Sequence, residues 1–167
     1  MRIDVALTAE ALVPGSVPGT TVLVVDVLRA STSMVAALGS GCAGIIPVAS
    51  AEEARRRRPE AGAGVLLAGE RRGDPIPGFD LGNSPVEFAT GRAHGKLVIF
   101  TTSNGTRALL AARGAAAIGV AALVNVSAAA TWALAGERDV IVVCAGERGA
   151  RSLEDQVCAG LLVERLR

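Results

Sequence analysis

The chain has 167 residues, a length typical of one compact domain with a substantial core. Half of the residues are hydrophobic, a fifth are charged, and the 17 basic and 16 acidic side chains nearly cancel. This balance excludes a strongly charged surface for nucleic acid or for a membrane. With one Trp, three Phe and no Tyr, the core is expected to consist of Val, Leu, Ile and Ala.

Strands and helices are predicted to alternate along the whole chain. The apolar runs predict strands over residues 2–7, 20–28, 43–48, 64–68, 96–101, 116–123 and 139–144. Helices are expected between and after them, beginning near Ser31, Ser50, Ser84, Ser103, Ser127 and Ser152. This order, with mostly short loops, predicts an α/β fold: a three-layer α/β/α sandwich with a mainly parallel (mixed) sheet, in a single domain spanning residues 1–167.

Some local signals sharpen these boundaries. Ser50 followed by Glu53, and Ser84-Pro85 followed by Glu87, are patterns typical of capped helix starts. The chain stops at Arg167 inside a predicted helix, so we expect a shortened molecule or one completed by a partner chain, such as a second copy.

Residues 114–136 carry no charge and are long enough to cross a bilayer. Their Ala- and Gly-rich composition, with polar Asn125 and Ser127 in the middle, disfavours insertion and predicts a buried strand followed by a helix. The first residues lack the apolar core of a signal peptide, and the three cysteines form no Cys-x-x-Cys pair. We therefore expect a cytoplasmic protein without a disulfide framework.

Polar, turn-rich segments follow four of the predicted strands. They are Asp26–Thr32, Gly69–Gly73 with Ile76–Ser84, Thr101–Arg107, and Cys144–Gly149 with Ser152–Asp155. Ligands of open α/β sheets bind outside the carboxyl ends of the strands. The four segments are therefore expected to form one shared site.

The chemistry of these segments suits a small phosphorylated anion. Helix starts and Gly-rich turns present free amides, and arginines can hold anionic oxygens in bidentate fashion. Hydroxyl groups and guanidinium groups for this purpose are carried by Ser31, Thr32, Thr102, Ser103, Thr106, Arg29, Arg71 and Arg107. Carboxylates beside them would repel a phosphate unless they hold a divalent cation or move protons, and Mg²⁺ needs few carboxylates.

Several of these residues also have a purely structural interpretation. Ser31 and Thr102 are good helix caps. An ion pair with Arg29 would explain why Asp26 ends an apolar run. Stabilisation in a first helical turn, or simple exposure to solvent, would account for Glu154, Asp155, Arg148 and Arg151.

Familiar motifs of other classes are incomplete here. Residues 39–44 match G-x-G-x-x-G, but they follow a predicted helix and precede a strand, the reverse of the dinucleotide-binding context. Leu28 stands where haloacid-dehalogenase phosphatases have their second aspartate. Cys144 lacks the correctly spaced arginine of a cysteine phosphatase, because Ala150 occupies that position. The single histidine, His94, is expected at the surface.

Five segments, in order, resemble signature segments of the 2-phosphosulfolactate phosphatase family. They are Asp26–Thr32, Gly69–Arg71, Gly78–Pro85, Thr101–Thr106 and Ser152–Asp155. The resemblance implies a three-layer α/β/α fold. It also implies Mg²⁺-dependent hydrolysis of 2-phospho-3-sulfolactate to 3-sulfolactate and phosphate, a step of coenzyme M biosynthesis.

The resemblance and the chemistry together give a predicted site. Catalytic roles are predicted for Asp26, Arg29, Glu70 and Asp80. Contacts with the substrate are predicted for Ser31, Thr32, Arg71, Asn83, Thr102, Ser103, Asn104 and Arg107. The candidate Mg²⁺ ligands are Asp26, Asp80, Glu154 and Asp155.

Two other functions remain open at this point. One is a non-catalytic domain, or one of different specificity, that binds small phospho-anions. The other is a sugar-phosphate isomerase, which the lack of a placed histidine or lysine base disfavours.

Overall fold

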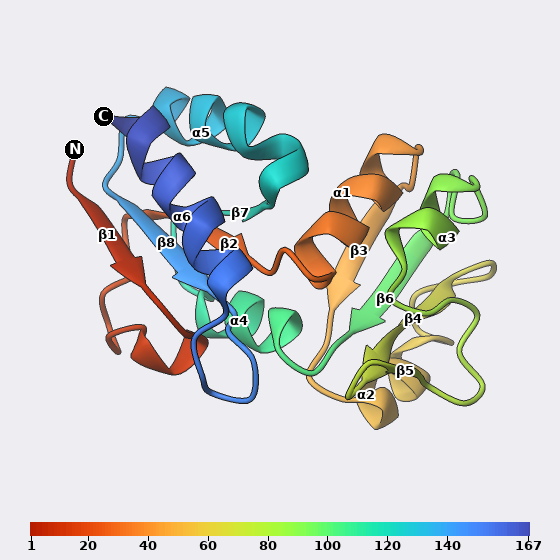
Figure 1. Ribbon diagram of the computed structural model, residues 1–167. Coiled ribbons are helices and arrows are strands. Elements are labelled where there is room, and N and C mark those ends of the chain that lie inside the picture. Colours follow the sequence, from red (N-terminus) through yellow and green to blue (C-terminus); the bar gives the residue numbers. More distant parts are fainter.

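The strands form two four-stranded sheets that lie beside one another (Figure 1). The computed structural model describes residues 1–167. Sheet A is fully parallel and contains, in spatial order, β1 (Ile3–Ala6), β8 (Val140–Cys144), β2 (Thr21–Val25) and β7 (Ala117–Ala121). Sheet B contains β3 (Gly44–Pro47), β6 (Leu97–Thr101), β4 (Leu66–Arg71) and β5 (Asp74–Pro75), of which only β5 is antiparallel to its neighbour.

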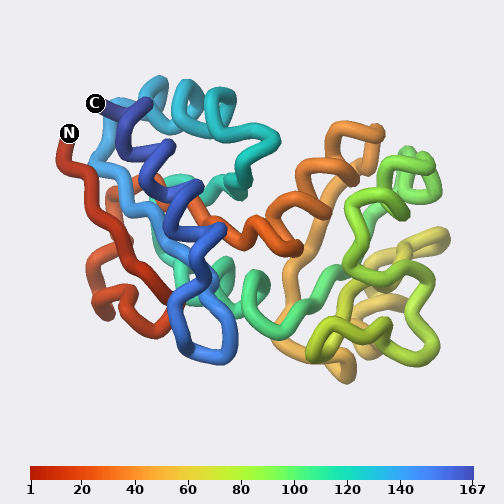
Figure 2. The backbone as a smooth tube through the Cα atoms, in the orientation of Figure 1, coloured from red at the N-terminus to blue at the C-terminus, as the bar shows by residue number.

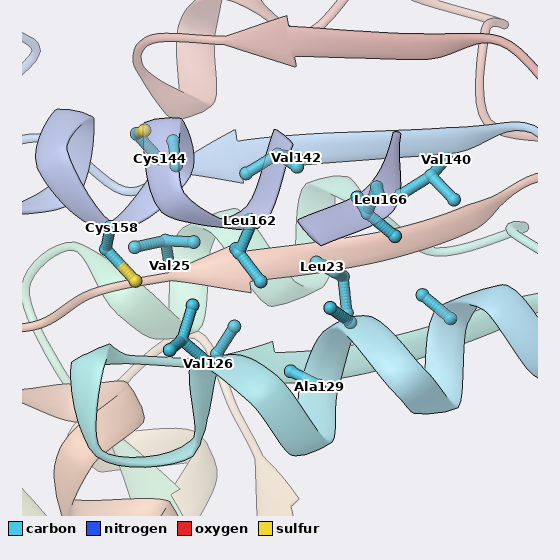
Figure 3. Close-up of a cluster of buried hydrophobic side chains, with 14 of the residues drawn as sticks. Leu23, Val25, Val126, Ala129, Val140, Val142, Cys144, Cys158, Leu162 and Leu166 are labelled. Carbon is cyan, nitrogen blue, oxygen red and sulfur yellow. The ribbon is translucent and has the colours of Figure 1, made fainter. Parts of the chain in front are cut away.

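Helices cover both faces of sheet A. On one face, α5 (Val126–Ala135) and α6 (Leu153–Leu166), the latter with Leu162, pack on inward strand side chains such as Leu23 and Val142 (Figure 3). On the other face, α4 (Gly105–Ala111) and a 3-10 turn (Ala9–Ala11) cover the alternate residues of the same strands. The central strands β2 and β8 therefore read as continuous apolar runs because both of their faces are buried.

Sheet B is covered in the same way. Side chains of α1 (Ala30–Gly39) and α3 (Pro85–Ala89) pack against Val98 and Phe100. Ile99 points to the opposite face, where α2 (Ala51–Arg57) covers it. Each sheet is thus the middle layer of three, which confirms the predicted α/β/α class.

Each predicted strand and helix is present, but the strands divide between two sheets. The chain leaves sheet A after β2, builds sheet B, and returns to sheet A after β6. We call residues 26–29 the first crossover and residues 102–104 the second crossover. Figure 2 shows the tube passing between the two halves, with both termini on the sheet A side. Because each crossover starts at the carboxyl end of a strand, both halves contribute to one site.

The local helix signals were partly right. Ser50 accepts a hydrogen bond from the Glu53 amide at 3.1 Å, as predicted. Ser84 makes no such bond; α3 begins at Pro85 as expected, but Glu87 instead accepts the Gly82 amide at 2.9 Å. Residues 114–136 contain β7, a 3-10 turn (Leu123–Asn125) and α5. No helix of the chain combines the length and apolar character that a membrane crossing requires.

Candidate active site

A cleft of about 850 Å³ opens at the carboxyl ends of β2, β4, β6 and β8. Both sheets and both crossovers line it. The structure brings eleven of the predicted site residues together here: Asp26, Arg29, Glu70, Arg71, Asn83, Thr102, Ser103, Asn104, Arg107, Glu154 and Asp155. The expectation that distant segments meet at one place is confirmed.

Asp26 follows β2 and is only 8% exposed. Its Oδ1 accepts the Ala30 amide at 3.2 Å, and the Gly105 amide also donates to the carboxylate. Burial, and then the nearby Asp155 and Glu70 carboxylates, raise the pKa of Asp26 to about 7. No ion pair joins Asp26 to Arg29, so the structural interpretation of this aspartate does not hold.

Asp155 joins the ends of two strands of sheet A. Its Oδ1 accepts the Val27 amide at 2.9 Å and its Oδ2 accepts the Gly146 amide at 3.1 Å. The side chain is 2% exposed, and burial raises its pKa despite these two bonds. Glu154, one residue earlier, also lines the cleft and is less buried. Asp155 therefore does more than stabilise the start of α6.

Glu70, at the end of β4 in sheet B, is hydrogen-bonded to the second crossover. Its Oε1 accepts the Ser103 amide at 2.7 Å, and its Oε2 accepts the Gly73 amide at 2.7 Å and the Ser103 hydroxyl at 3.1 Å. The preceding Gly69 has φ +143°, and a Cβ there would lie 1.9 Å from the Thr101 carbonyl oxygen. Glycine is thus required where β4 approaches β6 beside this carboxylate.

The start of α4 is held by a reciprocal threonine pair. The Thr102 hydroxyl accepts the Thr106 amide at 3.1 Å, and the Thr106 hydroxyl accepts the Thr102 amide at 3.0 Å. Thr102 thus binds an amide of the first turn of α4 and also lines the cleft, whereas the N-cap residue itself is Asn104. At Gly105, a Cβ would lie 2.5 Å from Asp26 Oδ2, so the helix start fits closely against that carboxylate.

The predicted arginines hold positive charge at the cleft. Arg29 donates to the Gly73 carbonyl at 3.2 Å, and Arg71 donates to the Glu70 carbonyl and to the Thr101 hydroxyl, both at 2.8 Å. Neither has a carboxylate partner, whereas Arg107 pairs with Glu10 at 2.5 Å. Because guanidinium groups bonded to neutral oxygens keep their full charge, this wall attracts anions.

Asn83 adds an amide group to the wall of the cleft. Its backbone carbonyl accepts the Ser33 hydroxyl at 3.1 Å, which holds the segment against α1. The side chain is 6% exposed, and its Oδ1 is buried without a hydrogen-bond partner. A buried polar atom without a partner is uncommon in a folded protein and is often found at a functional site.

Three predicted site residues have structural roles instead. Asp80 accepts the Leu67 amide at 2.8 Å and pairs with Arg58 at 3.1 Å, near the amino end of β4. It does not line the cleft, because the cleft lies at the carboxyl end of the same strand. The position of Asp80 therefore does not support its predicted catalytic and Mg²⁺-binding roles.

Ser31 and Thr32 are the other two. The Ser31 hydroxyl donates to the Val24 carbonyl at 3.1 Å and accepts the Asp26 amide at 3.0 Å. The Thr32 hydroxyl donates to the Val27 carbonyl at 2.6 Å. These bonds turn both hydroxyls toward the first crossover, and neither residue lines the cleft. Both hydroxyls support the backbone around Asp26, and their positions do not support the predicted contacts with the substrate.

Sequence reasoning missed other residues of the cleft wall, notably Arg72, Glu147 and Arg148. Arg72 belongs to one of the polar segments identified in the sequence, and Arg148 is exposed, as its structural interpretation expects, while it also lines the cleft. Each arginine precedes a glycine in a turn after a strand. That repeated Arg-Gly pair was the signal that could have identified them.

The carboxylates of the cleft form no closed metal cage. No group of three or more His, Cys, Asp and Glu side chains is arranged to hold a metal ion. Mg²⁺ does not need such a group, since it is usually bound by one or two carboxylates together with water and substrate phosphate oxygens. Asp26, Glu154 and Asp155 bring carboxylate oxygens of this kind to the cleft wall, and one or two of them would suffice; Mg²⁺ binding stays a prediction.

Comparisons with known proteins agree on one family. The family model described as 2-phosphosulpholactate phosphatase matches residues 6–167. A probable 2-phosphosulfolactate phosphatase of Thermotoga petrophila is 44% identical over 147 residues, covering 88% of this chain and 63% of that protein. Another, of Clostridium acetobutylicum, is 37% identical over 163 residues, covering 98% of this chain and 69% of that protein. The chain thus spans about two thirds of the length of these relatives.

Proposed function

Because this chain belongs to the 2-phosphosulpholactate phosphatase family, we propose that its cleft hydrolyses 2-phosphosulfolactate to 3-sulfolactate and phosphate with the help of Mg²⁺. The names of the relatives support the phosphatase activity. The reaction would serve a pathway such as coenzyme M biosynthesis. The cytoplasmic location and a homo-oligomeric state stay predictions.

One observation carries the proposal: the buried Asp26 carboxyl faces a cleft whose walls hold arginines from both sheets. The proposed substrate carries phosphate, sulfonate and carboxylate groups. Its binding requires several fixed positive groups and free amides within one cleft. Arg29 and Arg71 supply charge that no protein carboxylate neutralises, and Asn83 supplies an amide.

Asp26 is placed to handle the proton of the reaction. In hydrolysis, the bond between phosphorus and the ester oxygen breaks, a water oxygen bonds to phosphorus, and the leaving oxygen gains a proton. As long as Mg²⁺ is not bound to it, the Asp26 carboxyl group has a pKa of about 7 and exchanges a proton readily at neutral pH. The amide bonds from Ala30 and Gly105 fix its orientation during the transfer. Water and Asp26 are both candidates for the attacking group.

Mg²⁺, when bound, would neutralise the charge of the phosphoryl oxygens. One or two of the carboxylates of Asp26, Glu154 and Asp155 would hold it, and the substrate and water would complete the shell. Around it, Glu70 keeps the second crossover in place, and Arg29 and Arg71 hold the anionic groups. Positioning and electrostatic stabilisation would supply most of the rate enhancement.

A phosphate-release screen tests the function. The purified chain is incubated with small phosphorylated acids, including 2-phosphosulfolactate, with Mg²⁺ or with a chelator. We expect release to be fastest from 2-phosphosulfolactate and to require Mg²⁺. Release that is unaffected by the chelator would contradict the role of the metal.

The alternative is a domain that binds phospho-anions without cleaving them. Titration calorimetry separates the two functions, because the alternative predicts binding of 2-phosphosulfolactate with no phosphate release under any metal condition.

A further inference from the structure

Two tight turns with the same unusual design face the cleft. The first, Arg71–Asp74, connects β4 to β5 and has φ +56° at Arg72 and +91° at Gly73. The second, Glu147–Ala150, follows β8 and has φ +52° at Arg148 and +81° at Gly149. One turn belongs to sheet B and the other to sheet A, and Arg72 and Arg148 both line the cleft.

Arginine is an unfavourable residue at this position of a turn. When both central residues have positive φ, Asn-Gly, Asp-Gly and Gly-Gly are preferred. An arginine there costs about 1–2 kcal/mol relative to its ordinary backbone conformation. Strain of this kind clusters at binding and active sites, where the side chain is needed. Only one other non-glycine residue of the chain, Glu137, has positive φ.

The backbone amides of the two arginines form hydrogen bonds with two consecutive residues. The Arg72 amide donates to the Ser103 hydroxyl at 2.9 Å, and the Arg148 amide donates to the Asn104 side-chain oxygen at 3.4 Å. Ser103 and Asn104 are consecutive in the second crossover. The crossover thus sets the positions of both turn tips at once, although the turns belong to different sheets.

The side chains of these two arginines are free. Neither guanidinium takes part in an ion pair or in a side-chain hydrogen bond. Their backbones are fixed while their charged groups have no protein partner. That combination is expected where a ligand supplies the partner.

We propose that Arg72 and Arg148 form a two-sided clamp for the anionic groups that accompany the phosphate ester. This inference rests on the proposed function and deepens it. The phosphoryl group lies beside Asp26, and the two arginines hold the sulfonate or carboxylate groups from opposite walls. The cleft therefore selects phosphate esters with at least one further anionic group over esters of uncharged alcohols.

Single substitutions test whether each arginine contributes to binding of the second anionic group. Arg72→Met and Arg148→Met are each compared with the unchanged chain on 2-phosphosulfolactate and on ethyl phosphate, which lacks a second anionic group. We expect each substitution to lower kcat/KM for 2-phosphosulfolactate by about tenfold to a hundredfold, as is typical of a lost charged hydrogen bond. For ethyl phosphate, kcat/KM should change less than about threefold, because only phosphoryl contacts remain.

Two controls separate recognition from stability and from net charge. Arg56→Met removes an exposed positive charge of α2 outside the cleft and should leave both kcat/KM values unchanged. Arg72→Asn relieves the backbone strain and should raise Tm by about 3 °C while still losing selectivity. Glu137→Asn relieves strain outside the cleft, so it should raise Tm without changing selectivity.

The outcomes distinguish the clamp from the function itself. Equal losses for both esters, or no loss for 2-phosphosulfolactate, overturn the clamp while leaving the phosphatase in place. If no ester is cleaved, calorimetry with 2-phosphosulfolactate replaces kinetics. A tenfold weaker Kd in both methionine variants would then support the clamp, and an unchanged Kd would overturn it.

Discussion

Asp26 is a carboxyl group that folding removes from water beside two other carboxylates. Its pKa rises from 3.8 to about 7, so the folded chain binds this proton more tightly than the unfolded chain does. In the absence of metal, the free energy of unfolding therefore falls as pH rises from about 4 to about 7, and it is constant with respect to this group above that range. Between these two pH values, the free energy of unfolding falls by about 4 kcal/mol because of this group.

Replacing Asp26 should therefore stabilise the fold while removing activity. In Asp26→Asn, the amide avoids the burial of a charge but loses one of the two backbone amide bonds. We expect unfolding at pH 8, measured by denaturant titration with a chelator present, to require about 2 kcal/mol more than in the unchanged chain. At pH 4 this gain should vanish. Phosphate release should fall by at least about a hundredfold.

Asp80→Asn is the matched control, because Asp80 lies outside the cleft. This substitution should weaken the bonds to the Leu67 amide and Arg58 and lower the free energy of unfolding by about 1 kcal/mol. Its kcat/KM should stay unchanged. Full activity in Asp26→Asn, or a large kinetic loss in Asp80→Asn, would contradict the assignment of the site.

At the scale of an element, α4 begins with Gly105 because a larger residue there would collide with the Asp26 side chain. Gly105 has no positive φ, so its reason is space: a Cβ would lie 2.5 Å from Asp26 Oδ2 and 2.6 Å from the Ala30 Cβ. Gly160 in α6 has open space around its Cβ position. The two helical glycines therefore differ in what an added methyl group would meet.

The pair Gly105→Ala and Gly160→Ala tests this difference. Alanine favours a helix, and Gly160→Ala should raise the free energy of unfolding by up to about 1 kcal/mol. Gly105→Ala should lower it by about 1–3 kcal/mol and reduce phosphate release at least tenfold, because the methyl group displaces the Asp26 carboxylate. Thermal unfolding and phosphate release measure both effects. A stabilised and fully active Gly105→Ala would show that α4 does not fix Asp26.

The elements and the class of the fold could be predicted because their signals are local. Apolar runs such as 20–28 identify buried strands, and Ser152 accepts the Asp155 amide as a helix cap should. The role of Asp80 could not be predicted in this way. Its position depends on the path of the loop between β4 and α3, which places it at the amino end of β4, and no local pattern sets that path.

At the scale of the whole molecule, the division into two sheets also escaped prediction. Strand pairing depends on contacts between segments far apart in sequence, such as β1 with β8 and β2 with β7. Although the strands divide between two sheets, the polar segments still meet at the strand ends, as expected. Each crossover leaves one sheet at its carboxyl end, so the ends of both sheets border the same cleft.

Glu70 connects the turn after β4 to the second crossover, through which the chain passes from sheet B to sheet A. Each oxygen of its carboxylate accepts a backbone amide, from Ser103 and from Gly73. In Glu70→Gln, the new NH₂ group must face one of these donors, so at least one bond is lost in a buried place. We expect the free energy of unfolding to fall by about 1–3 kcal/mol.

Amide hydrogen exchange shows which of the hydrogen bonds of Glu70 are lost in the variant. In Glu70→Gln, the amides of Gly73 and Ser103 should exchange faster, and kcat/KM should fall because the turn that carries Arg72 loses its anchor at Ser103. Glu52→Gln, a fully exposed change on α2, is the control and should alter neither quantity. If exchange in residues 70–73 and 102–104 stays the same in Glu70→Gln, the site does not depend on this carboxylate for its shape.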